Sequence, residues 1–296
     1  IASAAYHSGG EYDGIVGRRV IECKYGENPW QTPAGLYVTD EDAAMGLHQF
    51  KLAMGTPPSF INLTDLDRLL QTVGHIAQGM WINFQRDMPI AVGVKHGNAC
   101  GAAVGYGVEL TDEDALRGMI DGDPLALFGG WVMTTFGLNR ELAELLLTYQ
   151  MPKGERRLLD GVVVPWINDD AIELFHRKGD KCRVMTNTGL SCPTACLDQM
   201  PRRRHVRAGY LKQPNYTFIL NVSDSTFGRE GEFTSDQLRD LVLAWAVGST
   251  SNSNTISLVK GGKLLGNGIG QHDRVMACEL AVRRAHRAGH VTKGAS

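Results

Sequence analysis

Short apolar runs alternate along the chain with stretches in which apolar residues recur at helical spacing. Residues 89–94 form one such run, and their length and apolar content predict a buried strand that ends at Lys95. From Thr64 onward, apolar side chains fall on one helical face: Leu66, Leu69, Leu70, Val73, Ala77 and Met80. Thr64 and Asp67 have a spacing that resembles a capping box, so we expect a helix to begin there and to lead into the strand.

The rest of the chain continues this alternation. Strands are predicted at residues 15–24, 161–165, 182–185, 216–222 and 255–259, and helices at 111–120, 139–149, 168–177 and 235–247. Gly261 and Gly262 predict a hairpin turn, and the glycines within residues 266–270 are expected to open a last helix that runs through Arg284. An alternation of this kind predicts an α/β fold. No internal repeat is visible in the sequence.

Residues 187–204 lose this periodicity and end in three consecutive arginines. We therefore predict a first subdomain at residues 1–186, a linker at 187–204 and a second subdomain at 205–296. The paired glycines Gly129 and Gly130 interrupt the apolar run 125–134, which indicates a close approach of the backbone or a bulge.

The composition is that of an ordinary globular protein. The 296 residues are 43% hydrophobic and 21% charged, and the formal net charge is −2, so nothing favours nucleic acid or an acidic membrane surface as a partner. No apolar run is long enough to span a bilayer. The six cysteines are scattered, unlike those of a small secreted scaffold, and we therefore expect a cytoplasmic protein.

The stretch 92–101, with the sequence VGVKHGNACG, is the first candidate for chemistry. Lys95 and His96 can face one ligand only if the strand stops between them, because adjacent strand residues point to opposite sides. The glycines that follow make such a stop feasible. Lys95 would then supply a cation for an oxyanion or a phosphate, and His96 a base. The alternative is a solvated Lys-His pair at the end of a strand.

Two other motifs carry weaker signals. Gly266, Gly268 and Gly270 do not match a dinucleotide fingerprint or a P-loop, but glycines ahead of a helix expose N–H groups that attract anions, and Arg274 could add a bidentate contact. A structural turn fits equally well. Cys192 and Cys196 have a three-residue spacer instead of the two of zinc deaminases, and no His-x-Glu precedes them, so we interpret this segment as a loop. The three arginines are interpreted as a solvated turn.

Several motifs occur in one order that is specific to a known family. They are residues 24–31 (KYGENPWQ), 60–63 (FINL), Lys95-His96 with Asn98 and Cys100-Gly101, Asp123-Pro124 with Phe128-Gly129-Gly130, Asp160-Gly161, Ser253-Asn254, and the glycines 266–270 with Gln271 and Arg274. From about residue 15 to about residue 290 the chain resembles the AICAR transformylase domain of the bifunctional purine-biosynthesis enzyme.

This resemblance implies transfer of a formyl group from 10-formyltetrahydrofolate to the 5-amino group of AICAR, without a metal. His96 would be the proton acceptor, Lys95 its cationic neighbour, and Asn254 a contact to the reacting end, for which Asn252 is an alternative. The residues that would hold the nucleotide are Lys24, Tyr25, Asn62, Gly129, Asp160 and Arg274. The implied fold is the cytidine-deaminase-like type, a three-layer α/β fold without zinc, and the implied assembly is a homodimer with shared active sites.

The chain also departs from the pattern of the family. Lys24 stands where the family usually has arginine, and Ala99 replaces a usual proline. The C-terminal part of the family domain, with its Ser-Asp-Ala-Phe-Phe-Pro-Phe stretch, and the cyclohydrolase domain are not found in these 296 residues. We therefore expect a fragment that binds AICAR weakly and turns over little. The alternatives are a non-catalytic nucleotide-binding relative and, more remotely, a zinc deaminase.

Overall fold

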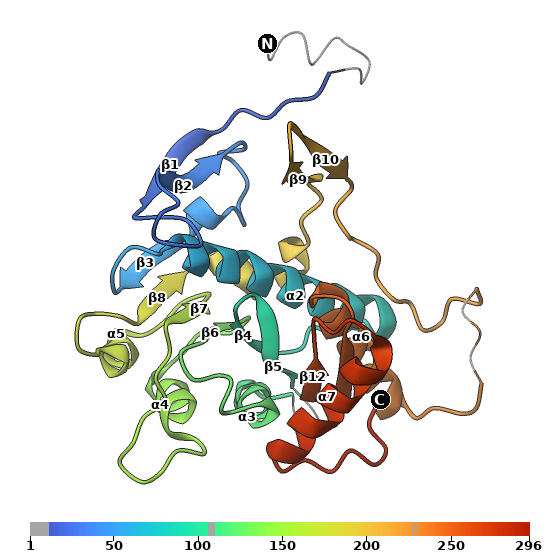
Figure 1. The fold of residues 1–296 in the computed structure, drawn as a ribbon. Coiled ribbons are helices and arrows are strands. Elements are labelled where there is room, and N and C mark those ends of the chain that lie inside the picture. The colour runs from blue at the N-terminus through green and yellow to red at the C-terminus, as the bar shows by residue number, and fades with distance from the viewer. Residues whose placement is uncertain (1–11, 106–109, 227, 229) are drawn as a thin grey trace.

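The computed structural model describes residues 12–105, 110–226, 228 and 230–296. Its centre is an eight-stranded mixed sheet in the order β11-β12-β5-β4-β6-β7-β8-β3, and β1-β2 and β9-β10 form two separate hairpins (Figure 1). The strands of the large sheet are β3 (Lys51–Met54), β4 (Ile90–Lys95), β5 (Asn98–Val104), β6 (Trp131–Thr134), β7 (Gly161–Val164), β8 (Arg183–Thr186), β11 (Ile256–Lys260) and β12 (Lys263–Gly268). The strands of the two hairpins are β1 (Arg18–Cys23), β2 (Ala34–Val38), β9 (Arg202–Val206) and β10 (Gly209–Gln213).

Helices cover both faces of this sheet. The helices are α2 (Phe60–Phe84), α3 (Asp112–Gly122), α4 (Arg140–Thr148), α5 (Asp169–Ile172), α6 (Ser235–Thr250) and α7 (Arg274–Arg287), with short 3-10 turns η1 (Leu47–Gln49), η2 (Glu173–Phe175), η3 (Thr188–Ser191) and η4 (Pro193–Cys196). One core joins α2 and α6 to side chains such as Val92 and Val94, and the other joins α3 and α4 to side chains such as Ala91. The α/β class is therefore confirmed. In the described part of the chain no helix is long and apolar enough to cross a membrane.

Most predicted elements lie where the apolar pattern placed them, but five predictions differ from the structure. Helix α2 begins at Phe60 instead of Thr64, because Ser59 and Asn62 form the capping box. Residues 266–268 belong to strand β12, and α7 begins only at Arg274, capped by Asp273. The predicted helix 168–177 is shorter, since α5 passes into the 3-10 turn η2. Arg202, Arg203 and Arg204 lie in strand β9 of a hairpin, not in a turn.

The predicted strand at 216–222 is not a strand. Its backbone instead follows α2, where the Asn83 side chain donates to the Leu220 carbonyl at 2.7 Å and accepts from the Val222 N–H at 2.7 Å. Its aromatic side chains pack on the helices, with the Tyr216 ring stacked on His75 at 5.8 Å. The segment carries strand-like residues because they cover helices, not because they pair with another strand.

Two parts of the chain have the same arrangement of a helix, a hairpin and a second helix. They are α2-β4-β5-α3 and α6-β11-β12-α7, and they meet where β5 pairs with β12 (Figure 1). Both first helices begin with a capping box, and both hairpins turn through two residues with left-handed backbone angles. The predicted division into subdomains at 187–204 stays a prediction, and both of its parts contribute strands to the one sheet.

Candidate active site

Three predicted site residues lie together at one edge of the large sheet. Strand β4 runs antiparallel to β6, with Val94 opposite Trp131, and β6 runs parallel to β7, with Trp131 opposite Gly161. The end of β4 and the starts of β6 and β7 therefore share an edge, which brings Lys95, Gly129 and Asp160 close to one another. The Asp160 N–H donates to the Gly130 carbonyl at 3.0 Å and so fixes the two loops against each other.

Lys95 is half-buried at this edge. Its Nζ donates to the Phe128 carbonyl at 2.6 Å, and a Cβ added to Gly129 would lie 3.9 Å from that Nζ. Gly129 has a φ of 70°, which favours glycine, and the lysine therefore meets nearly bare backbone. The Asp160 carboxylate lies 3.4 Å from Arg177 Nη1, so the edge carries two cations and one anion. Such a cluster can bind a charged ligand.

His96 begins the turn that follows β4. The strand ends at Lys95, as the sequence predicted, and His96 and Gly97 have φ values of 51° and 71°. On one side the Gly97 N–H donates to Asp65 Oδ1 of α2 at 2.7 Å. On the other side the Asn98 side chain donates to the His96 carbonyl at 3.0 Å. The turn is thus held from two directions while the His96 side chain stays exposed.

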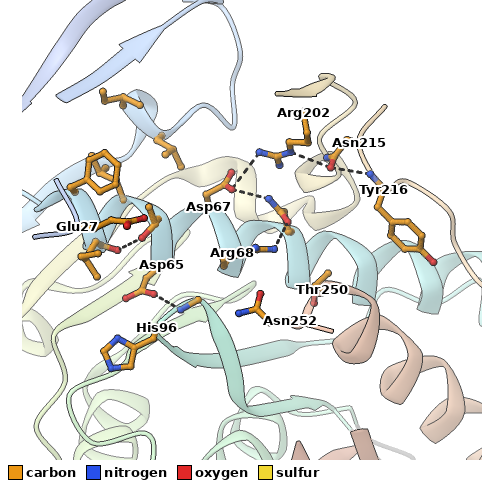
Figure 2. Close-up of a pocket in the computed structure, with 18 of the residues that line it drawn as sticks. Glu27, Asp65, Asp67, Arg68, His96, Arg202, Asn215, Tyr216, Thr250 and Asn252 are labelled. Atoms are coloured by element: carbon orange, nitrogen blue, oxygen red, sulfur yellow. Dashed lines mark hydrogen bonds and ion pairs between the residues drawn. The ribbon is translucent and has the colours of Figure 1, made fainter. Parts of the chain in front are cut away.

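The turn forms part of the wall of a cavity of about 860 Å³ that runs along α2. Figure 2 shows Asp65 and His96 near one end of it, Asn252 farther along on the same side of α2, and Arg202, Asn215 and Tyr216 on the other side of the helix. All nine predicted site residues lie in the described part of the chain, and His96 is the one among them that lines this cavity. The cavity and the Lys95 edge therefore meet at the His96 turn.

The three predicted residues nearest the N-terminus do not line the cavity. Lys24 and Tyr25 follow strand β1 in a turn that the Gly26 N–H closes on the Gln31 carbonyl at 2.8 Å, and Glu27 of this turn lines the cavity. The Asn62 side chain accepts from the Ser59 N–H at 2.9 Å. That contact occupies the Asn62 oxygen in a helix cap and leaves its amide nitrogen for a ligand.

The two predicted residues of the second half lie in the loop after α6 and at the start of α7. The Asn254 amide donates to the carbonyls of Gln271 at 3.0 Å and His272 at 3.1 Å, which ties the loop to the segment before α7. Arg274 is exposed at the first position of α7. Asn252, the alternative to Asn254, lines the cavity, and its N–H donates to Asn98 Oδ1 at 3.1 Å. In this chain Asn252 thus faces the His96 turn.

The glycines ahead of α7 have a packing role. A Cβ on Gly266 or Gly268 would run into the carbonyl oxygens of Ala281 or Ala277, so these glycines let α7 lie directly on β12. Gly130 has a similar role at the edge, where an added Cβ would meet the Val94 carbonyl at 2.7 Å. The expected close approach at the paired glycines is therefore confirmed.

Asp65 is the site residue that sequence reasoning missed. It is 6% exposed and lines the cavity. Burial raises the pKa of its carboxyl, the Gly97 N–H and the charge of protonated His96 lower it, and the charge of Asp160 raises it. Asp65 is therefore electrostatically linked to both the turn and the edge. The available signal was a charged residue between the buried Leu63 and Leu66 on an apolar helix face.

Among the described residues no three His, Cys, Asp or Glu side chains form a group that could hold a metal ion. Cys192 is exposed and Cys196 is buried in the short turn η4, which agrees with a loop.

Comparison with known proteins identifies the family. A family model described as the AICARFT/IMPCHase bienzyme matches residues 5–284. The bifunctional purine biosynthesis protein PurH of Anoxybacillus flavithermus is 30% identical over 278 residues, which cover 92% of this chain and 47% of that protein. The PurH protein of Synechococcus sp. strain CC9311 is 31% identical over 265 residues, which cover 88% and 46%.

The chain thus spans about half the length of the curated relatives it matches. The ordered motifs, from the KYGENPWQ stretch to Arg274, fall inside the matched region. The resemblance seen in the sequence is therefore confirmed: the chain belongs to the AICARFT/IMPCHase bienzyme family.

Proposed function

We propose that this chain carries the site for formyl transfer from 10-formyltetrahydrofolate to the 5-amino group of AICAR. A bond forms between the amino nitrogen and the formyl carbon, and the bond from that carbon to N10 of the folate breaks. The amine loses a proton, and the departing folate nitrogen gains one. The product is formyl-AICAR, a purine precursor. Family membership and the charged edge beside the His96 turn support this reaction.

The proposed roles follow from what each group can do. An amine conjugated into an imidazole ring is a poor nucleophile, so a base must take its proton as it attacks. His96 is exposed on a held turn and can be that base. Lys95 presents a cation beside the glycine backbone of Gly129, where it can stabilise the oxyanion that develops on the formyl group. No metal ion is needed for either step.

The nucleotide is proposed to bind across the edge. Gly129 and Asp160 would contact it from the loops ahead of β6 and β7, and Lys24, Tyr25 and Asn62 from the region around β1 and the start of α2. Arg274 would add a cation for the phosphate. Asn254 is proposed to contact the reacting end of AICAR. Asn252 lines the cavity and is the alternative residue for this role.

The two similar helix-hairpin-helix units and the large sheet between helices support a cytidine-deaminase-like fold without zinc. We propose a cytoplasmic homodimer in which each site draws residues from both chains.

The observation that carries this proposal is the ending of β4 at Lys95, which puts Lys95 at the sheet edge and His96 on the turn. The test is AICAR-dependent formyl transfer by the polypeptide that contains these 296 residues, with formyl-AICAR measured by mass spectrometry. We expect product only when both AICAR and 10-formyltetrahydrofolate are present. An analogue of AICAR that lacks the 5-amino group is the matched control. Binding of AICAR without any product would instead support a non-catalytic nucleotide-binding relative.

A further inference from the structure

A buried carboxylate lies directly beside the turn that carries His96. Asp65, on the first turns of α2, accepts a hydrogen bond from the Gly97 N–H at 2.7 Å (Figure 2). The same helix packs on the turn, since a Cβ on Gly97 would lie 3.2 Å from Arg68 Cγ. Any movement of the Asp65 side chain or of α2 would therefore also move the backbone from which the His96 side chain projects.

The second helix-hairpin-helix unit contains the same contact without a histidine. Asp240 of α6 is 5% exposed, and its two carboxylate oxygens accept from the N–H groups of Gly261 at 2.9 Å and Gly262 at 2.7 Å. Asp65 and Asp240 each stand six residues after the residue that caps their helix, Ser59 and Thr234. The contact itself is thus a structural feature of both units.

The two carboxylates differ in their charged surroundings. Protonated His96 and Asp160 both act on Asp65, whereas Asp236 and Arg239 act on Asp240. The Asp65 carboxylate therefore attracts the positive charge that the imidazole carries when it holds a proton. At the second turn Gly261 occupies the place of the histidine, so no such charge develops there.

We propose that Asp65 is a positioning residue that holds the His96 turn and supplies the counter-charge for the imidazolium formed during the reaction. This inference rests on the proposed function for its catalytic part. Its structural part, the orientation of His96 by Asp65, can be measured in the protein alone. Asp240 holds its turn through hydrogen bonds but has no histidine to act on.

The experiment compares Asp65→Asn with the matched variant Asp240→Asn. In Asp65→Asn the amide oxygen can still accept from the Gly97 N–H, and in Asp240→Asn it can still accept from one of the two glycine N–H groups. Both variants lose the negative charge and keep a hydrogen bond to the turn. In Asp65→Asn we expect kcat for formyl transfer to fall at least about tenfold while the dissociation constant for AICAR changes less than about threefold. In Asp240→Asn we expect kcat to stay within about twofold of the wild type.

A second readout needs no activity. The ring 1H–15N resonances of His96, assigned with a His96→Gln variant, should shift in Asp65→Asn and stay unchanged in Asp240→Asn. If His96 is insensitive to Asp65→Asn, or if kcat falls equally in both variants, the inference is wrong. If the resonances shift but the wild-type protein transfers no formyl group, the proposed function fails while the positioning of His96 by Asp65 stands.

Discussion

The chemistry at the residue scale depends on where one strand ends. Lys95 and His96 are adjacent, and the sequence predicted their separation correctly because the apolar run stops at Lys95 and turn-forming residues follow. Asp65 could not be predicted as their neighbour, since its contact to Gly97 spans 32 positions and involves a backbone N–H. A contact of this kind leaves no periodic pattern in the sequence.

Cysteine reactivity tests the burial of individual side chains. Burial raises the pKa of Cys100, Cys182 and Cys196 to about 12, and it also raises the pKa of Cys23. A thiol with a raised pKa stays protonated and unreactive at pH values below that pKa. Alkylation by iodoacetamide at about pH 8, near the ordinary thiol pKa, should therefore modify the exposed Cys192 and Cys278 and spare the other four. Peptide mass spectrometry of the native protein gives the pattern, and rapid labelling of Cys100 would contradict the described core.

At the scale of elements, the apolar pattern placed helices well and their ends less well. Helix α2 begins at Phe60, four residues earlier than expected, because Ser59 and Asn62 form the capping box that was expected of Thr64 and Asp67. The glycines of β12 were expected to open a helix, and they lie in a strand because α7 packs against their bare backbone. A glycine-rich stretch allows both outcomes, and only the tertiary contact decides between them.

The packing of α7 on β12 gives a direct test of that contact. A Cβ at position 268 would collide with the Ala277 carbonyl, which is backbone and cannot rotate away. We expect Gly268→Ala to lower the free energy of unfolding by about 3 kcal/mol or more. The matched control is Gly209→Ala, because nothing lies within 4 Å of an added Cβ there. Equal urea midpoints for the two variants would show that α7 does not lie on β12 as described.

At the scale of the whole molecule, the duplicated unit was invisible in the sequence. The two units share Lys-x-Gly at the hairpin, at residues 95–97 and 260–262, and an aspartate in the preceding helix, but their intervening residues differ. The two units are alike in the order of their elements and in the contact from the aspartate to the hairpin turn. A pattern of apolar residues does not reveal either feature. The α/β class could be predicted because every unit follows the same alternation of helix and strand.

The proposed sharing of sites between two chains is testable by mixing inactive variants. Lys95→Ala and Asn254→Ala would each disable a different contribution to one site. If each site takes Lys95 from one chain and Asn254 from its partner, free exchange of subunits should restore up to about a quarter of the activity. The same mixing with Asn252→Ala tests the alternative residue.

Subunit exchange must be shown independently by native mass spectrometry. Exchange without recovered activity would place the residues in one chain's site, an arrangement that the hydrogen bond from the Asn252 N–H to Asn98 already makes sterically feasible.

The central claim is that His96, on the turn after β4, is the base of a formyl-transfer site. The most direct measurement is kcat for formyl transfer to AICAR in His96→Ala, together with the dissociation constant for AICAR and the same values for the exposed control His286→Ala. We expect kcat to fall by roughly a hundredfold or more in His96→Ala, with AICAR binding nearly unchanged, and no loss in the control. Turnover by His96→Ala at nearly the wild-type rate would contradict the account.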